Sequence, residues 1–89
     1  MEEKAEGEEV RELVLLVSPL CPESLETAVR LRKLASMRGY SFREVSALES
    51  EGLKMIEDFG IKRVPAAIMG GRLLFQGRVP ENLESLLER

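Results

Sequence analysis

The apolar residues near the start of the chain predict a buried strand followed at once by a helix. A compact run of Leu and Val from Glu12 to Val17 stops at Ser18-Pro19, a pattern typical of a strand buried on both faces at the centre of a sheet. Pro22 suits the first position of a helix, where its missing N–H costs no hydrogen bond. We expect this helix to run to about Arg38 and to end at Gly39.

The spacing of apolar residues in this helix predicts the face that packs on the sheet. Glu26 and Arg30 are four residues apart, which favours an ion pair on the exposed side. The predicted apolar stripe comprises Leu25, Ala28, Val29, Leu31, Leu34 and Ala35.

The middle of the chain predicts a second strand and a second helix. Residues Ser41 to Val45 have strand character, with Phe42 and Val45 as the main apolar side chains. Ser46 and Glu49 resemble a capping box that opens a helix, although Gly52 leaves its exact start open. The predicted apolar face of this helix consists of Leu53, Ile56 and Phe59, and Gly60 ends it.

The last third predicts a hairpin and a short helix. Residues Ala66 to Met69 and Arg72 to Phe75 flank Gly70-Gly71, which suits a tight turn because glycine tolerates positive φ. Pro80 is expected to open a terminal helix with an apolar face of Leu83, Leu86 and Leu87. The order β-α-β-α-β-β-α predicts an α/β fold with a four-stranded mixed sheet, whose first two strands are parallel.

Length and composition limit the organisation and location of the protein. The 89 residues, with 44% apolar and 33% charged side chains, fit one domain at residues 11–89. Residues 1–10 are rich in Glu and have no hydrophobic period, so we expect a flexible acidic arm. No apolar run approaches the ~20 residues that span a bilayer, and the first residues do not resemble a signal peptide. We therefore expect a cytoplasmic protein without membrane contact.

Charge and rare residue types exclude several kinds of chemistry. The net charge is −3, with three Phe and one Tyr, which does not favour nucleic-acid binding. A single cysteine cannot form an internal disulfide, and without histidine there is no Cys/His zinc site and no Ser-His or Cys-His catalytic pair. We expect neither a metal nor a cofactor, and the sequence leaves the oligomeric state open.

Three motifs in a fixed order resemble a known superfamily. They are Ser18-Pro19-Leu20-Cys21-Pro22-Glu23-Ser24, Asp58-Phe59-Gly60-Ile61-Lys62-Arg63-Val64-Pro65, and Gly70-Gly71-Arg72 with Gly77-Arg78-Val79. Together with the element order they resemble the thioredoxin and glutaredoxin superfamily, especially its small archaeal-type members, from Leu13 to the C-terminus. The resemblance implies a thioredoxin-like fold.

The resemblance also assigns the site. Cys21 matches the exposed first cysteine of Cys-x-x-Cys and Ser24 takes the place of the second, which gives a CxxS motif. Val64-Pro65 matches the Val-Pro with a cis peptide bond, so Pro65 is the expected cis-proline. The chain departs from the family at Ala66, where Thr or Ser is common, and at Leu15, where thioredoxins bury an acidic residue. It also lacks the Trp before the cysteine, and Gly77-Arg78 only partly matches the glutaredoxin glycine pair.

The position of Cys21 favours a reactive thiol. At a helix N-terminus, unpaired N–H groups and the helix dipole favour thiolate, the attacking species, although Glu23 in the first turn opposes this effect. With one thiol, attack on a disulfide stops at a mixed disulfide that an external thiol must resolve. The sequence thus predicts a monothiol thiol–disulfide oxidoreductase that acts on protein or small-molecule disulfides, with a protein disulfide or a low-molecular-weight thiol as its partner. Cys21 is the expected nucleophile, and Ser24 is at most a hydrogen-bond donor to its sulfur. The expected substrate-binding residues are Pro19, Leu20, Pro22, Val64, Pro65 and Gly77.

Other functions stay open at this point. The groove expected around Leu20, Cys21, Val64 and Pro65 could hold a protein partner in a redox-inactive module, because a fold alone does not fix a function. Ser24 could instead replace a native cysteine, in which case the parent protein would be a dithiol reductase. Iron–sulfur binding of the monothiol glutaredoxin kind is disfavoured, because Pro22-Glu23 stands where those proteins have Gly-Phe.

Overall fold

The computed structural model describes residues 11–87, and the acidic arm predicted at residues 1–10 lies outside them. The element order is the predicted one: β1 (Glu12–Val17), α1 (Pro22–Arg38), β2 (Ser41–Ser46), α2 (Ser50–Phe59), β3 (Ala66–Met69), β4 (Arg72–Gln76) and α3 (Leu83–Leu87).

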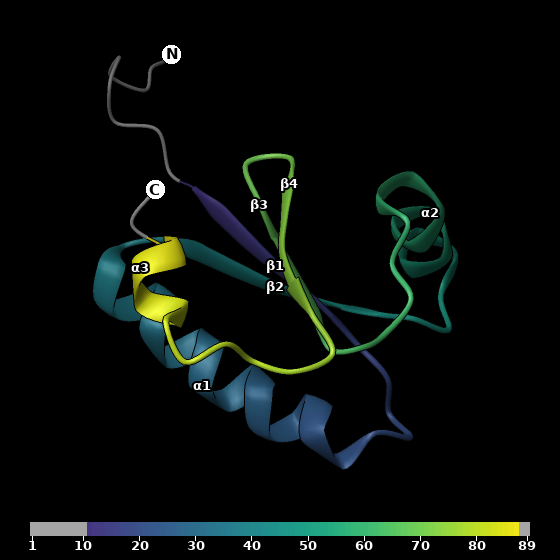
Figure 1. Ribbon diagram of the computed structural model, residues 1–89, viewed down its shortest axis with the longest axis horizontal. Coiled ribbons are helices and arrows are strands. Elements are labelled where there is room, and N and C mark those ends of the chain that lie inside the picture. Colours follow the sequence, from purple (N-terminus) through teal and green to yellow (C-terminus); the bar gives the residue numbers. More distant parts are fainter. Residues whose placement is uncertain (1–10, 88–89) are drawn as a thin grey trace.

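The four strands form one mixed sheet in the order β2-β1-β3-β4 (Figure 1). β1 pairs in parallel with β2 and antiparallel with β3, and β4 completes the antiparallel hairpin. The predicted α/β fold with a four-stranded mixed sheet is confirmed. The central place of β1 is confirmed as well, since its four middle residues are all buried.

Alternate residues of β1 divide the core between the two faces of the sheet. Leu13 and Leu15 pack with residues of α1 and α3, whereas Val14 and Leu16 pack on the face that α2 covers. Figure 1 shows the same division, with α1 and α3 close together and α2 apart from them. A strand that is apolar on both faces therefore carries helices on both.

The predicted face of α1 is partly wrong. Leu25 and Val29 are 63% and 65% exposed, and the buried residues are Ser24, Thr27, Ala28, Leu31 and Ala35. These five follow the 3.6-residue helical period, so the face that meets the sheet is polar in the first turns and apolar later. The expected ion pair between Glu26 and Arg30 is absent from the residues that the structure describes.

The start of α2 also differs from the prediction. The helix begins at Ser50 with Glu49 as N-cap and no side-chain cap, because the Ser46 hydroxyl instead accepts a hydrogen bond from the Leu48 N–H at 3.1 Å. Gly52 is the buried residue of this helix, and a Cβ there would collide with the Ser46 carbonyl oxygen. Glycine thus lets α2 lie against the end of β2. Leu53 is 57% exposed and is not part of the packed face.

The hairpin prediction is confirmed, and the terminal helix is shorter than predicted. Gly70 and Gly71 both have positive φ, 63° and 76°, as a two-residue turn requires. Pro80 does not open α3, which starts at Leu83. Leu83 and Leu87 are nevertheless fully buried against α1 and β1.

Charged side chains tie β2 to its neighbours. Arg43 donates hydrogen bonds to Glu12 of β1 at 3.2 Å and to Glu51 of α2 at 2.6 Å. The hydrogen bond to Glu51 is the main cause of a raised pKa for the Arg43 guanidinium. No helix in residues 11–87 is both long enough and apolar enough to cross a bilayer.

Candidate active site

Cys21 lies at the end of the turn that connects the central strand β1 to α1. It is the N-cap residue, with extended backbone angles (φ −115°, ψ 108°), and Pro22 follows as the first helical residue. Its N–H donates to the Ser18 carbonyl oxygen at 3.0 Å, and its own carbonyl oxygen accepts from the Ser24 N–H at 3.0 Å. The thiol is free and half-buried. The turn thus presents the sulfur at the helix N-terminus, where a negative charge is favoured.

Ser24 lies inside the protein, one turn into the helix. Its side chain is fully buried, and its hydroxyl oxygen accepts a hydrogen bond from the Ser18 N–H at 3.3 Å. In the described part of the chain, no hydrogen bond joins this hydroxyl to the Cys21 sulfur. The observed contact braces the turn that carries Cys21.

The register of β1 and β3 brings the second motif to the same end of the sheet. Leu16 pairs with Ala66, so Pro65, one residue earlier, lies beside Val17 in this antiparallel pair. The Val64–Pro65 peptide bond is cis, and Pro65 is fully buried. Cys21 and this loop thus border the same end of β1.

Gln76, for which the sequence predicted no role, holds the loop of residues 61–65 in place. Its Oε1 accepts hydrogen bonds from the N–H groups of Lys62 at 2.7 Å and Arg63 at 3.2 Å. The Gly77 N–H donates to the Pro65 carbonyl oxygen at 2.8 Å. A cue existed in the sequence, because Gln76 is the single Gln in the chain and directly follows the strand predicted at Arg72 to Phe75.

Val64 lies between Arg63 and Pro65, which each have a hydrogen-bonded backbone group, but its own backbone groups are free within the described chain. Within residues 11–87, neither its N–H nor its carbonyl oxygen has a hydrogen-bond partner. The side chain is half-buried and packs on the core face that α2 covers. Free backbone groups beside a sheet end are able to pair with an extended peptide.

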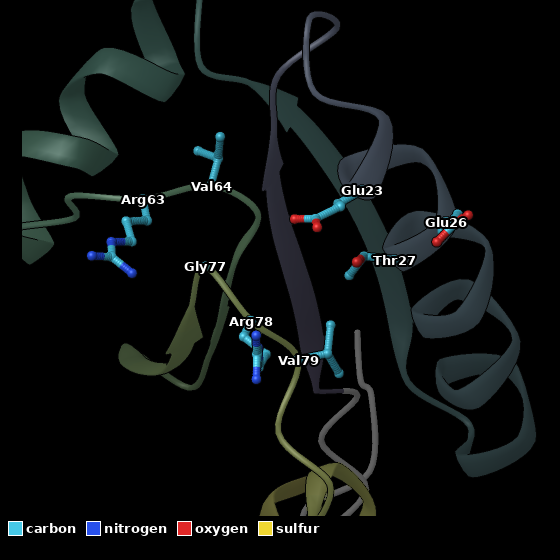
Figure 2. A pocket seen from close by; sticks show the side chains of 8 residues that line it. All are labelled: Glu23, Glu26, Thr27, Arg63, Val64, Gly77, Arg78 and Val79. Atoms are coloured by element: carbon cyan, nitrogen blue, oxygen red, sulfur yellow. The ribbon is translucent and has the colours of Figure 1, made fainter.

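A cleft of about 650 Å³ lies between α1 and the loops that precede β3 and follow β4 (Figure 2). Two of the predicted substrate-binding residues, Val64 and Gly77, line it. The prediction missed the other lining residues, which are Glu23, Glu26, Thr27, Arg63, Arg78 and Val79.

The remaining predicted substrate-binding residues do not line the cleft. Pro19, Leu20 and Pro22 are exposed, and Leu20 reaches 83% exposure. Pro65 is fully buried. The structure therefore divides the predicted site into an exposed turn with Cys21 and a neighbouring polar cleft. No three acidic or Cys side chains among residues 11–87 come together as a metal site would require.

Comparison with known proteins rests on structure alone. No protein-family model matches the chain, and no curated protein matches it significantly. A chain from the complex of ferredoxin:thioredoxin reductase with thioredoxin f2 superposes with a TM-score of 0.71 at 15% identity, covering 89% of this chain and 76% of that chain.

Two further solved structures agree with this likeness. A thioredoxin-like protein from Clostridium perfringens gives a TM-score of 0.66 at 17% identity, covering 86% of this chain and 71% of its own. A thioredoxin from Thermus thermophilus gives 0.61 at 18% identity, covering 89% of this chain and 72% of its own. With the strand order β2-β1-β3-β4, these similarities show that the chain has the thioredoxin-like fold.

Proposed function

We propose that this protein is a cytoplasmic monothiol thiol–disulfide oxidoreductase with Cys21 as its nucleophile. The observation that carries the proposal is the half-buried free thiol at the N-cap of α1, beside a loop whose Val64 backbone groups have no partner in the described chain. Solved structures of the same fold include thioredoxins, which supports a redox role in general.

The proposed reaction exchanges one disulfide for another. The Cys21 thiolate attacks one sulfur of a substrate disulfide, the substrate S–S bond breaks, and the departing sulfur leaves as a thiolate that takes a proton from water. The product is a mixed disulfide between Cys21 and the substrate. The thiolate of an external low-molecular-weight thiol then attacks the substrate sulfur of this mixed disulfide. It forms a new disulfide with the substrate, and Cys21 leaves as the thiolate. A single cysteine requires this second thiol.

Residues around the thiol have supporting roles in this proposal. Pro22 fixes the entrance of α1, and the exposed turn residues Pro19 and Leu20 offer contact area to a protein substrate. Val64 pairs through its backbone with the substrate, and Pro65 and Gly77 hold that loop by their mutual hydrogen bond. Ser24 braces the turn through Ser18.

Intact mass after incubation with glutathione disulfide tests the proposal. We expect one glutathione adduct per chain, reversed by a reducing thiol and absent from Cys21→Ser. The rate should exceed that of N-acetylcysteine under the same conditions, because the exposed turn and the free Val64 backbone groups hold a disulfide beside the sulfur. A rate no faster than that of N-acetylcysteine contradicts an activated thiol.

A second candidate function is partner binding without chemistry, which the 83% exposure of Leu20 favours. Cys21→Ser separates the two, because a binding module keeps its cellular function in this variant and an oxidoreductase loses it.

Ser24→Cys tests descent from a dithiol reductase. Because Ser24 follows Cys21 by one helical turn and is buried, an introduced thiol is expected to displace the substrate and leave an internal disulfide. Accumulation of the mixed disulfide in this variant would show that position 24 cannot serve as a resolving thiol.

A further inference from the structure

The cleft beside the proposed thiol carries opposite charges on its two sides. Glu23 and Glu26 come from the first turns of α1, whereas Arg63 precedes β3 and Arg78 follows β4. Figure 2 shows the Glu23 side chain reaching from α1 into the gap, across from the segments that carry the arginines. A ligand between them meets negative charge on one side and positive charge on the other.

These four charges are not neutralised within the structure. No ion pair or side-chain hydrogen bond satisfies any of them in residues 11–87. By contrast, Arg43 of β2 holds two carboxylates at once. The charges around the cleft are therefore available to a ligand.

Thr27 provides a second, independent sign of a binding site. Its side chain is 6% exposed, yet within the described residues its hydroxyl has no hydrogen-bond partner. It lines the cleft, and Figure 2 shows it directed from α1 toward the opposite loops. A buried hydroxyl without a partner is costly, and a polar group of a bound ligand would satisfy it.

We propose that this cleft selects polypeptide disulfides in which the reacting cysteine is flanked by one basic and one acidic side chain. The basic side chain lies toward Glu23 and Glu26, the acidic one lies toward Arg63 and Arg78, and a polar backbone group reaches the Thr27 hydroxyl. This inference rests on the proposed exchange at Cys21 and names its substrate class.

The surroundings favour a polypeptide over a small disulfide. A volume of about 650 Å³ is within the range of clefts that bind drug-sized ligands. Val64 offers unpaired backbone groups to an extended strand, and the exposed Leu20 lies on the turn that carries Cys21. A chain that continues past the disulfide reaches all three features.

Exchange rates with short capped peptides test the selection. Each peptide carries one cysteine as its symmetrical disulfide, with flanking residues Lys/Glu, Glu/Lys, Lys/Lys, Glu/Glu or Ala/Ala, and glutathione disulfide completes the set. Each rate of mixed-disulfide formation is divided by that of N-acetylcysteine with the same disulfide. We expect the relative rate of one of the two peptides with mixed charges to exceed that of Ala/Ala. The gain should be roughly two- to fivefold for each flanking charge that faces an opposite charge of the cleft, as exposed ion pairs allow. This preference should shrink at high ionic strength.

Variants assign the preference to the cleft. The double variant Glu23→Gln with Glu26→Gln should remove the rate gain that the lysine of the peptide provides. The double variant Arg63→Gln with Arg78→Gln should remove the rate gain that the glutamate provides. Matched controls are Glu57→Gln on α2 and Arg72→Gln at the hairpin, both exposed and outside the cleft, and these should keep the ratios. Thr27→Val should slow peptide exchange roughly two- to tenfold, as the loss of one hydrogen bond predicts, and Thr27→Ser should recover the rate.

The outcomes separate this inference from the function beneath it. If all peptides react at the same relative rate and the cleft variants change no ratio, the selection is wrong while the exchange at Cys21 stands. If glutathione disulfide reacts faster than every peptide, a polypeptide is the wrong substrate class. If no disulfide modifies Cys21, the proposed function itself fails.

Discussion

The two halves of α1 use the same buried face for different purposes. In the C-terminal half this face consists of Leu31 and Ala35, both fully buried in the core with β1 and α3. In the N-terminal half the face bears Ser24 and Thr27, which are just as enclosed but polar. Burying a hydroxyl costs free energy unless it is hydrogen-bonded. The Ser24 hydroxyl has a partner in the Ser18 N–H, whereas that of Thr27 has none among residues 11–87, so the first turns add less stability than the last ones.

The difference places stability and candidate chemistry at opposite ends of one helix. The Ser24 hydroxyl braces the turn with Cys21, and the Thr27 hydroxyl faces the cleft. Substitutions in the C-terminal half should therefore change the free energy of unfolding. Substitutions in the N-terminal half should change the exchange reaction as well.

The largest effect on stability is expected from Leu31→Ala. Leu31 is fully buried, so the truncation leaves a cavity and should lower the free energy of unfolding by about 2–5 kcal/mol. Urea denaturation measures this value. The control is Leu25→Ala on the same helix, which is 63% exposed and should change stability by no more than about 0.5 kcal/mol. Equal losses in the two variants would contradict the face assigned to α1.

Ser24→Ala probes the N-terminal half. The variant leaves the Ser18 N–H without its acceptor, and an unpaired, partly buried N–H costs about 1–3 kcal/mol. Because this contact holds the turn of Cys21, the rate of mixed-disulfide formation should fall along with stability. Ser24→Thr keeps the hydroxyl and serves as the comparison. Unchanged exchange in a destabilised Ser24→Ala protein would limit Ser24 to a purely structural role.

The element order was predictable because each element has its own local signal. β1 is a continuous apolar run, and Gly39 and Gly60 end their helices in the left-handed conformation. The helix starts were less predictable. The start of α2 depends on the close approach of Gly52 to the backbone at the end of β2, and α3 begins three residues after Pro80. Those boundaries depend on contacts between distant parts of the chain.

The candidate site was predictable only where a motif marks it. Cys21, Val64, Gly77 and Arg78 belong to motifs, whereas Thr27 has the appearance of an ordinary helix residue. The apolar stripe was misjudged because Leu25 and Val29 are hydrophobic but exposed, while the polar Ser24 and Thr27 are buried. Hydrophobicity alone cannot distinguish a buried hydroxyl beside a cleft from a solvated one.

A smaller loss is expected at the C-terminal end of α1 from Tyr40→Phe. The Tyr40 hydroxyl donates to the Leu87 carbonyl oxygen at 2.6 Å and so joins the end of α1 to α3. Removing this partly buried hydrogen bond should lower the free energy of unfolding by about 0.5–1.5 kcal/mol. Exchange at Cys21 should keep its rate, because the contact belongs to the other end of the helix. A slower exchange in folded Tyr40→Phe would show that the two halves are coupled.

The smallest effect is expected from Arg32→Met. This variant removes a paired charge from the C-terminal half of α1, whereas Glu23 and Glu26 of the N-terminal half line the cleft and are unpaired within residues 11–87. Arg32 donates to Glu44 of β2 at 3.1 Å and lies over the Phe42 ring at 5.4 Å from its centroid. The ion pair is exposed, with side-chain exposures of 58% and 36%, so its loss should cost at most about 1 kcal/mol. Met keeps the apolar stem over Phe42. The difference from the unmodified protein should shrink in high salt, where exposed charges are screened. A loss of stability that persists in high salt would instead assign the effect to packing of the guanidinium on Phe42. Arg32→Lys then tests this packing, because it keeps the charge and removes the planar group.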